Sequence, residues 1–164
     1  MRLTQWTDYS LRVLMYCGAC AGRARPVTIA EIAQAHGISR SHLTKVVMTL
    51  SALGYLETTR GRGGGLRLLR PAGEIRVGEV VRHTEGDCRL LECFDPAVNT
   101  CRLDGRCRLK GMVRGALDSF LAHLDQFTLA DLIPPPGVQA EFPAATAGVP
   151  VAPPRARRGS AQAA

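Results

Sequence analysis

Apolar residues recur at steps of three and four in two long segments of this chain, one near the start and one past residue 100. The first segment predicts a helix that begins at Thr7 or Asp8 and runs to about Ala21. The second predicts a helix from about Leu109 to Thr128 with a continuous apolar stripe. That stripe exceeds what the core of one small domain needs, so we expect the helix to pack against a second copy of the chain in a homodimer.

Between these segments lie two shorter helical patterns that are joined by a glycine. Thr28 and Glu31 have the spacing of a capping box, which opens a helix that stops at Gly37. Ser39 then caps a further helix over residues 40–53, and a glycine follows that helix as its C-terminal cap. Two short helices with a glycine turn between them predict a helix-turn-helix.

A hairpin pattern follows directly. Residues 55–60 and 66–70 read as two strands, and the glycine-rich segment 61–65 forms the turn between them. Arginines flank these glycines behind a helix-turn-helix, which favours a DNA-contacting wing over a plain flexible turn. Polar and basic residues that face outward from the second helix and the wing are the candidates for DNA contact: Arg40, Ser41, His42, Lys45, Arg60, Arg62 and Arg67.

Three units follow from these patterns. Residues 1–75 form a winged helix-turn-helix DNA-binding domain, and residues 76–133 hold a short helix over 77–84, a cysteine-containing loop and the long dimerisation helix. Residues 134–164 begin with three prolines, are rich in Pro and Ala, and carry too few large apolar groups to fold, so we expect a disordered tail. The expected fold class is mainly α with a small β-hairpin.

Charge supports this assignment of a DNA partner. The 164 residues carry a net charge of +7 and give a pI of about 9.5. The excess lies in the N-terminal half, where residues 1–75 carry ten Lys or Arg against four Asp or Glu. A basic domain of this kind favours an anionic partner such as double-stranded DNA.

No apolar run reaches the length of a membrane span, and the N-terminus lacks the apolar region of a signal peptide. Six cysteines in such a chain are expected to be reduced thiols rather than a disulfide framework. We therefore expect a cytoplasmic protein with no membrane partner. No Ser/His/Asp arrangement or other catalytic constellation is visible, so an enzyme is not predicted.

Three of the cysteines share one short loop. Cys93, Cys101 and Cys107 have seven and then five residues between them, in a segment that contains Gly, Asp and Asn. Thiols pooled in a loop suggest ligation of a soft metal, and neither gap is the two-residue spacing of common zinc knuckles. An iron–sulfur cluster fits this pattern, with a fourth position left to another residue. A structural zinc site that also uses Cys88 is the alternative from another class.

Six stretches then give the chain a specific resemblance over nearly all of residues 1–133. It resembles the iron–sulfur repressors of the NsrR and IscR group, and within that group the NsrR-type, nitric-oxide-sensing members. The matching stretches are Leu-Thr-x-x-Thr-Asp-Tyr-x-Leu-Arg at 3–12, Ser-Arg-x-His-Leu-x-Lys-Val at 39–46, Arg-Gly-Arg-Gly-Gly-Gly-Leu-Arg-Leu at 60–68, Ile-Arg-Val-Gly-Glu-Val-Val-Arg at 75–82, Cys-Arg-Leu-Lys at 107–110 and Phe-Thr-Leu-Ala-Asp-Leu at 127–132.

The resemblance implies a repressor of nitrosative-stress genes whose cluster reacts with nitric oxide. It implies Cys93, Cys101 and Cys107 as ligands, with Asp8 of the partner subunit as the fourth, and it favours [4Fe–4S] while [2Fe–2S] also suits this ligand set. Lys110 stands where the IscR pattern has a ligating histidine, which favours the NsrR type. IscR-like sensing of cluster or iron supply remains the alternative input. Asp8 also has an alternative interpretation as a helix N-cap.

The remaining cysteines are assigned on weaker grounds. The loop is slightly longer than in the relatives, so Cys88 is either a ligand or a spare thiol, and Cys93 is preferred because its Leu-Leu-Glu-Cys frame matches the first ligand. Cys17 and Cys20 form a Cys-x-x-Cys on a predicted helix with apolar neighbours. We expect them to be small buried core residues rather than ligands.

Overall fold

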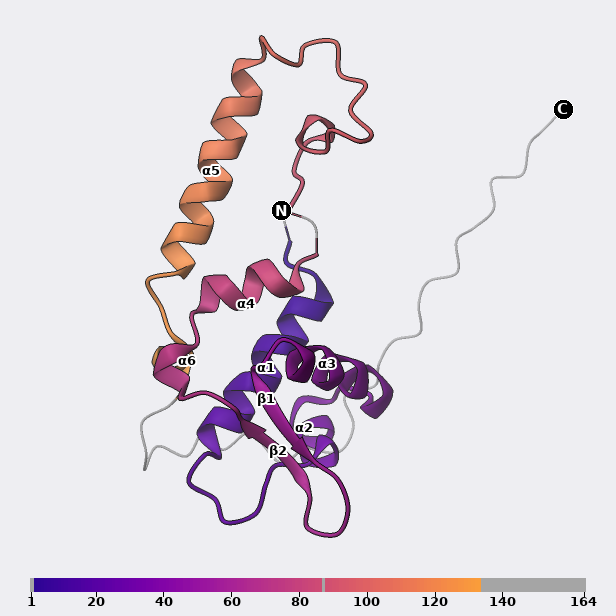
Figure 1. Ribbon diagram of the computed structural model, residues 1–164, viewed down its shortest axis with the longest axis vertical. Helices are drawn as coiled ribbons and strands as arrows, with labels where there is room; N and C mark the ends of the chain where they lie inside the picture. Colours follow the sequence, from indigo (N-terminus) through magenta and orange to yellow (C-terminus); the bar gives the residue numbers. More distant parts are fainter. Residues whose placement is uncertain (1, 87, 134–164) are drawn as a thin grey trace, which may run out of the picture.

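The computed structural model describes residues 2–86 and 88–133, so the expected tail at 134–164 lies outside the described residues. The described chain is mainly helical with one antiparallel hairpin, which confirms the predicted fold class (Figure 1). The elements in order are α1 (Gln5–Ala19), α2 (Ile29–His36), α3 (Arg40–Ala52), β1 (Leu56–Thr59), β2 (Gly65–Leu68), η1 (Ala72–Glu74), α4 (Val77–Thr84), η2 (Glu92–Phe94), α5 (Arg108–Leu124) and α6 (Leu129–Leu132).

Helix α1 begins before the predicted cap. Thr4 is the N-cap, because its side-chain oxygen accepts a hydrogen bond from the backbone N–H of Thr7 at 3.3 Å. The prediction that Thr7 or Asp8 caps this helix is therefore wrong, and Asp8 lies within the first turns of α1 instead. The helix ends at Ala19, slightly before the predicted Ala21.

The helix-turn-helix is confirmed with its predicted caps. Thr28 and Glu31 form a complete capping box at the start of α2, and Gly37 closes that helix in the left-handed conformation at a φ of 64°. Ser39 accepts from the His42 backbone N–H and opens α3. The two helices and α1 enclose one core. Its large buried members are Val13, Leu14, Ile32, Leu43, Val46, Leu50 and Tyr55.

The wing is a short hairpin whose strands pair in the register Leu56↔Leu68 to Thr59↔Gly65. Val27, from the segment before α2, pairs with Leu66 and extends the sheet by one bridge. At the tip, Gly61 and Gly63 have φ values of 92° and 83°, a region that side chains disfavour. The glycine-rich tip is therefore required by the turn and is not only a flexible spacer.

Helix α4 is attached to the winged helices by both apolar and polar contacts. Val80 belongs to the shared core. Tyr55 lies in the chain between α3 and β1 and is buried. Its hydroxyl donates to Glu79 Oε1 at 3.1 Å and lies 2.7 Å from Nδ1 of His83. The hydroxyl thus joins two side chains of α4 to the winged helices. Arg70 closes the group, bonding Glu79 at 3.1 Å.

The long helix is shorter than predicted. It ends at Leu124, and a turn leads into α6, which Thr128 and Asp131 open with a capping box. The turn returns the chain to the core, where the Leu129 side chain is 1% exposed and its N–H bonds the Ile75 carbonyl. A continuous helix to Thr128 would carry Leu129 away from that site, which explains the early end.

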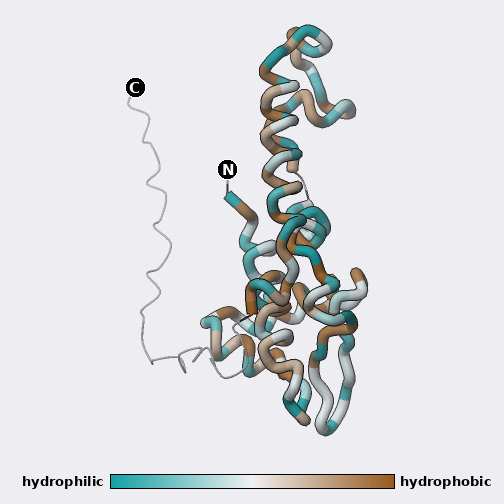
Figure 2. Tube along the Cα trace, turned by 90° about the vertical axis from the view of Figure 1, so that its left-hand side faces the viewer, coloured by the Kyte–Doolittle hydropathy of each residue, from teal (hydrophilic) through white to brown (hydrophobic). Residues whose placement is uncertain are grey.

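Helix α5 extends away from the winged helices in both views, with the cysteine-containing segment beside its first turns (Figures 1 and 2). On its apolar stripe Leu117, in the middle of the helix, is buried, and Phe120, Leu121 and Leu124 nearer the winged helices are half-buried. Towards the free end, Leu109 and Met112 are 55% and 72% exposed. Among the described residues, no helix is long and apolar enough to cross a membrane.

Candidate metal centre and nucleic-acid interface

The first turns of α3 present the predicted DNA-contacting side chains to solvent. Arg40, Ser41, His42 and Lys45 are all exposed, while Leu43 and Val46 between them face the core. The ring of Tyr9 from α1 lies 6.4 Å from the His42 ring. Within the described part of the chain, Arg40 and Lys45 form no ion pair, so both charges are available to phosphates or base edges.

The three wing arginines have different surroundings. Arg60 and Arg62 are exposed beside the glycine tip. Arg67 is half-buried, and its guanidinium donates to the backbone carbonyl oxygens of Arg23 at 3.2 Å and Ala24 at 2.8 Å. Arg67 thus holds the loop between α1 and α2 against the wing, a role that the sequence does not reveal because its partners are backbone atoms more than 40 residues away.

The three cysteines of the loop have unequal exposure. Cys93 lies in η2 and is 8% exposed, while Cys101 and Cys107 are half-buried, and all three thiols are free. Cys107 is the N-cap residue of the long helix α5, so one thiol lies in a short helical turn and another at the start of a helix. Free thiols on one loop are the donor set that an iron–sulfur cluster needs.

Hydrogen bonds fold this loop on itself. Glu92 Oε1, next to the first thiol, accepts from both the backbone N–H and the hydroxyl of Thr100, next to the second thiol, at 2.7 Å. These bonds hold the pKa of Glu92 below its ordinary value. Asn99 Oδ1 accepts from the Cys101 backbone N–H at 3.0 Å. Hydrogen bonds therefore join the segments that carry Cys93 and Cys101.

A second set of contacts attaches the loop to α5. Asp104 Oδ1 accepts from Lys110 Nζ at 2.5 Å, and this hydrogen bond raises the pKa of Lys110, with a smaller contribution from the nearby Cys93. The Arg114 guanidinium lies 4.3 Å from the centre of the Phe94 ring. Lys110 thus joins the first turn of α5 to the cysteine loop through Asp104.

The fit to a cluster is partial in a single chain. Among residues 2–86 and 88–133, no three His, Cys, Asp or Glu side chains are gathered closely enough to hold a metal ion. The donor chemistry fits, because three free thiols share one hydrogen-bonded loop. Within the described residues no further His, Cys, Asp or Glu is grouped with these thiols, and the resemblance leads us to expect the fourth ligand from a partner subunit.

Asp8 is held by its own helix. Arg12, one turn later, places Nε 3.0 Å from Oδ1 and Nη2 2.9 Å from Oδ2 of Asp8, and the two side chains are 44% and 45% exposed. A cavity opens beside Asp8 at the start of α1, lined also by Arg2, Leu3, Gln5 and Leu11. The carboxylate is therefore oriented and solvent-accessible, but no contact joins it to the cysteines of the same chain among the described residues.

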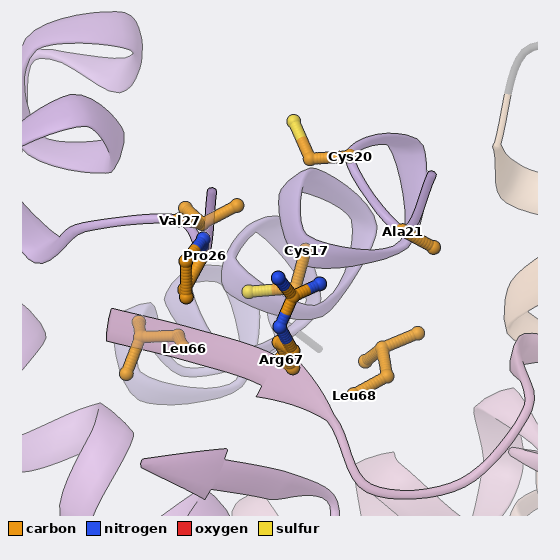
Figure 3. Close-up of a pocket in the computed structure, with 8 residues that line it drawn as sticks. All are labelled: Cys17, Cys20, Ala21, Pro26, Val27, Leu66, Arg67 and Leu68. Carbon is orange, nitrogen blue, oxygen red and sulfur yellow. The ribbon is translucent and has the colours of Figure 1, made fainter. Parts of the chain in front are cut away.

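Cys17 and Cys20 lie apart from this loop. They line a cavity of about 110 Å³ between the end of α1 and strand β2, with Pro26 and Val27 on the far side (Figure 3). Burial raises the pKa of the Cys17 thiol to about 12, so it stays protonated, and its core position is confirmed. Cys20 is only half-buried, and its sulfur accepts from Arg23 at 3.5 Å.

One polar group was missed by the sequence reasoning altogether. Glu85, just after α4, bonds Thr4 and Thr7 at the start of α1. The partners are about 80 residues apart in the chain, and no local pattern connects them. Only the Thr-x-x-Thr spacing at the start of α1 could have marked the cap.

Comparison with known proteins gives one consistent result. A profile of the Rrf2 family, described as an iron-dependent transcriptional regulator, matches residues 3–135. The HTH-type transcriptional regulator NsrR of Bacillus licheniformis is 48% identical over 133 residues, which are 81% of this chain and 92% of the relative. The protein of the same name from Bacillus subtilis strain 168 is 48% identical over 136 residues, 81% and 90% of the two chains.

Solved structures agree on the fold. The oxidised form of CymR from Staphylococcus aureus matches with a TM-score of 0.63 and 26% identity, over 80% of this chain and 95% of that one. T. potens IscR matches with a TM-score of 0.63 and 22% identity, over 80% and 85%. At that identity the second match supports the fold alone.

Proposed function

This chain belongs to the Rrf2 family of iron-dependent transcriptional regulators, and we propose that it is a repressor that senses nitric oxide through an iron–sulfur cluster. It is a DNA-binding transcriptional regulator, as its HTH-type relatives are, and not an enzyme. A regulator of this kind acts on the chromosome, so we place it in the cytoplasm. The observation that carries the sensing proposal is the loop of three free thiols that begins where α4 ends and folds back on α5.

The proposed ligands are Cys93, Cys101 and Cys107 of one subunit and Asp8 of the other. Three thiols and one carboxylate suit either [4Fe–4S], which we favour, or [2Fe–2S]. A bound cluster would supply an iron with one weakly held oxygen ligand, and such an iron is open to a small π-acid such as nitric oxide. Arg12 holds the Asp8 carboxylate on the exposed side of α1, and binding to iron would replace at least one of the two solvent-exposed bonds that Arg12 makes to the Asp8 oxygens.

The proposed dimer uses the free part of α5. Leu109 and Met112 are exposed on a helix that otherwise packs by its apolar side, and a second copy would cover them. The two winged domains would then address paired half-sites of one operator. In each, α3 enters the major groove with Arg40, Ser41, His42 and Lys45, while Arg60 and Arg62 engage the backbone and minor groove.

Repression and its release then correspond to two states of the dimer. When the cysteine loop is tied to Asp8 of the partner, the winged helices are held at the spacing of the operator. When that tie is lost, the spacing relaxes and affinity falls. Effective derepression needs a difference on the order of 2–4 kcal/mol between the states, or roughly 30- to 1,000-fold in affinity.

The test is anaerobic purification with assays of iron, sulfide and zinc and a visible spectrum, followed by operator binding before and after addition of nitric oxide. We expect a brown protein whose spectrum bleaches and whose affinity falls. A colourless zinc protein would contradict the sensing proposal in favour of the structural zinc module. A brown protein that loses affinity with cluster loss but not with nitric oxide would instead support IscR-like sensing.

Single substitutions test the ligand set in the same preparations. Cys107→Ser should lose the cluster, because it removes one of the three proposed thiolate ligands from a site with no surplus. Cys17→Ser is the matched control, since Cys17 is buried in the core and should leave the spectrum unchanged. If Cys88→Ser loses the cluster while Cys93→Ser keeps it, the first ligand is Cys88.

A further inference from the structure

Glu85 joins the end of α4 to the start of α1. Its carboxylate accepts hydrogen bonds from the Thr4 backbone N–H, at 2.9 Å to Oε1 and 3.2 Å to Oε2, and from the Thr4 hydroxyl at 3.2 Å. It also accepts from the Thr7 hydroxyl. A carboxylate in this place complements the positive end of α1, and hydrogen bonds to an ionised acceptor are stronger than neutral ones.

A buried hydroxyl pair extends this contact into the core. The Thr84 hydroxyl lies 3.1 Å from that of Thr7 and also bonds the Val80 carbonyl at 2.8 Å. Thr7 is fully buried and Thr84 is 5% exposed. Buried hydroxyls depend on their partners, so the first turn of α1 and the last turn of α4 are held in one relative position.

The contact between Glu85 and the start of α1 is followed in the chain by the cysteine loop on one side and by residues that reach helix α3 on the other. On one side, Gly86 turns the chain out of α4 at a φ of 63°, and Cys88 and the thiol loop follow. On the other side, Asp8 directly follows Thr7, and Tyr9 comes next with its ring against His42 of α3. The contact therefore lies between the cysteine loop and the recognition helix.

We propose that Glu85 is a positioning residue that transmits the state of the cysteine loop to the first turn of α1 within the same subunit. This inference rests on the proposed function and adds its route of regulation. When the loop is held by its ligands, Gly86 fixes the end of α4, and Glu85 keeps the start of α1 in place. When the loop is released, Glu85 moves with it, and the turn that carries Asp8 and Tyr9 loses its acceptor.

This role differs from that of a ligand. Both oxygens of Glu85 already accept from Thr4, and one of them also from Thr7. A ligand to iron would have to give up part of this set. Glu85 should therefore leave the cluster content and its spectrum unchanged while it controls how strongly the cluster affects DNA binding.

The experiment compares operator affinity with and without cluster in the full-length dimer of four proteins: wild type, Glu85→Gln, Glu85→Ala and the control Glu74→Ala. Glu74 is an exposed residue of η1, an element separate from α1, α4 and the cysteine loop. In the wild type we expect the cluster-loaded form to bind roughly 30- to 1,000-fold more tightly. In Glu85→Ala that ratio should fall to within about threefold of one, with Glu85→Gln between, and Glu74→Ala should match the wild type.

Hydrogen exchange of the Thr4 amide tests the same inference in the wild-type protein, so it does not depend on whether a Glu85 variant folds. In the wild type its protection should drop when the cluster is removed, because its acceptor is Glu85. A wild-type affinity ratio in Glu85→Ala, or loss of the cluster in that variant, would overturn the inference while leaving the proposed function standing. A ratio of one in the wild type itself would refute the proposed function and this route together.

Discussion

Replacing Asp8 by alanine separates a structural role for this residue from a role in the cluster. The sequence allowed Asp8 to be a helix cap, which would make the substitution costly. In the structure Thr4 is the cap, and Asp8 lies within α1 with Arg12 as its partner. The stability of the cluster-free protein should therefore depend little on Asp8.

The loss in free energy of unfolding caused by Asp8→Ala follows from three small contributions. The pair with Arg12 joins side chains that are 45% and 44% exposed, and such a pair stabilises by about 0.2–0.5 kcal/mol. An acidic residue near the start of a helix adds about 0.3–1 kcal/mol through the helix dipole. Alanine offsets roughly 0.5 kcal/mol of this by its higher helix propensity. The net loss is below about 1 kcal/mol.

Urea unfolding of the cluster-free protein measures this loss. With a slope of about 1.5 kcal/mol/M, the midpoint should fall by less than about 0.7 M at a fixed protein concentration. Arg12→Ala is the matched control, because it removes the same ion pair and keeps the carboxylate. The two variants should be similarly stable.

The anaerobically reconstituted proteins should differ. If Asp8 is the ligand from the partner subunit, Asp8→Ala should have an altered visible spectrum, a more labile cluster and weaker operator binding, whereas Arg12→Ala keeps a cluster ligand. Asp8→Cys should react more slowly with nitric oxide, since a thiolate replaces the weak oxygen ligand. An unaltered spectrum and nitrosylation rate in Asp8→Ala would refute the ligand assignment.

Three further predictions concern the wing, the core and acid stability. Arg62→Ala should reduce the slope of log K for operator binding against log salt concentration by about one if Arg62 neutralises one phosphate. Arg67→Ala should leave that slope unchanged and lower the free energy of unfolding by about 1–3 kcal/mol, because its guanidinium bonds backbone carbonyls. Tyr55→Phe should cost about 0.5–1.5 kcal/mol in thermal unfolding, since it removes the hydroxyl that joins Tyr55 to Glu79 and His83 of α4, and an unchanged melting temperature would argue against that network. Burial raises the pKa of Glu31, but hydrogen bonds from its capping box and an arginine outweigh burial and hold it below its ordinary value, so Glu31→Gln should be less stable at pH 7, and the difference should vanish as the pH falls through the lowered pKa. A difference that grows with acidity would contradict this sign.

The local elements could be predicted from the sequence where the signal is local. The capping box of Thr28 and Glu31, the glycine at residue 37 and the cap at Ser39 each act within one helical turn, so the helix-turn-helix was predicted with its bounds nearly correct. The glycine-rich turn is likewise a local signal, and the short helix Val77–Thr84 was also predicted with its bounds. The family was identified from motifs spread along residues 1–133, and the comparisons confirm it.

The tertiary structure decided which long-range partners these residues take. Helix α5 ends at Leu124 because the chain must return to bury Leu129, and no local pattern requires that turn. Arg67 looked like its neighbours on the wing, yet it bonds a loop from an earlier part of the chain.

The same holds for the start of α1 and its connection to the cysteine loop. A helix cap is chosen by which side-chain oxygen reaches the free N–H groups, and the sequence pattern predicted Thr7 or Asp8, whereas the structure uses Thr4. Glu85 settles the choice from about 80 residues away, because it packs against Thr4 and Thr7 and leaves Asp8 on the exposed side. Sequence periodicity reports which face of an element is buried, but the identity of what covers it depends on how distant elements meet in the fold.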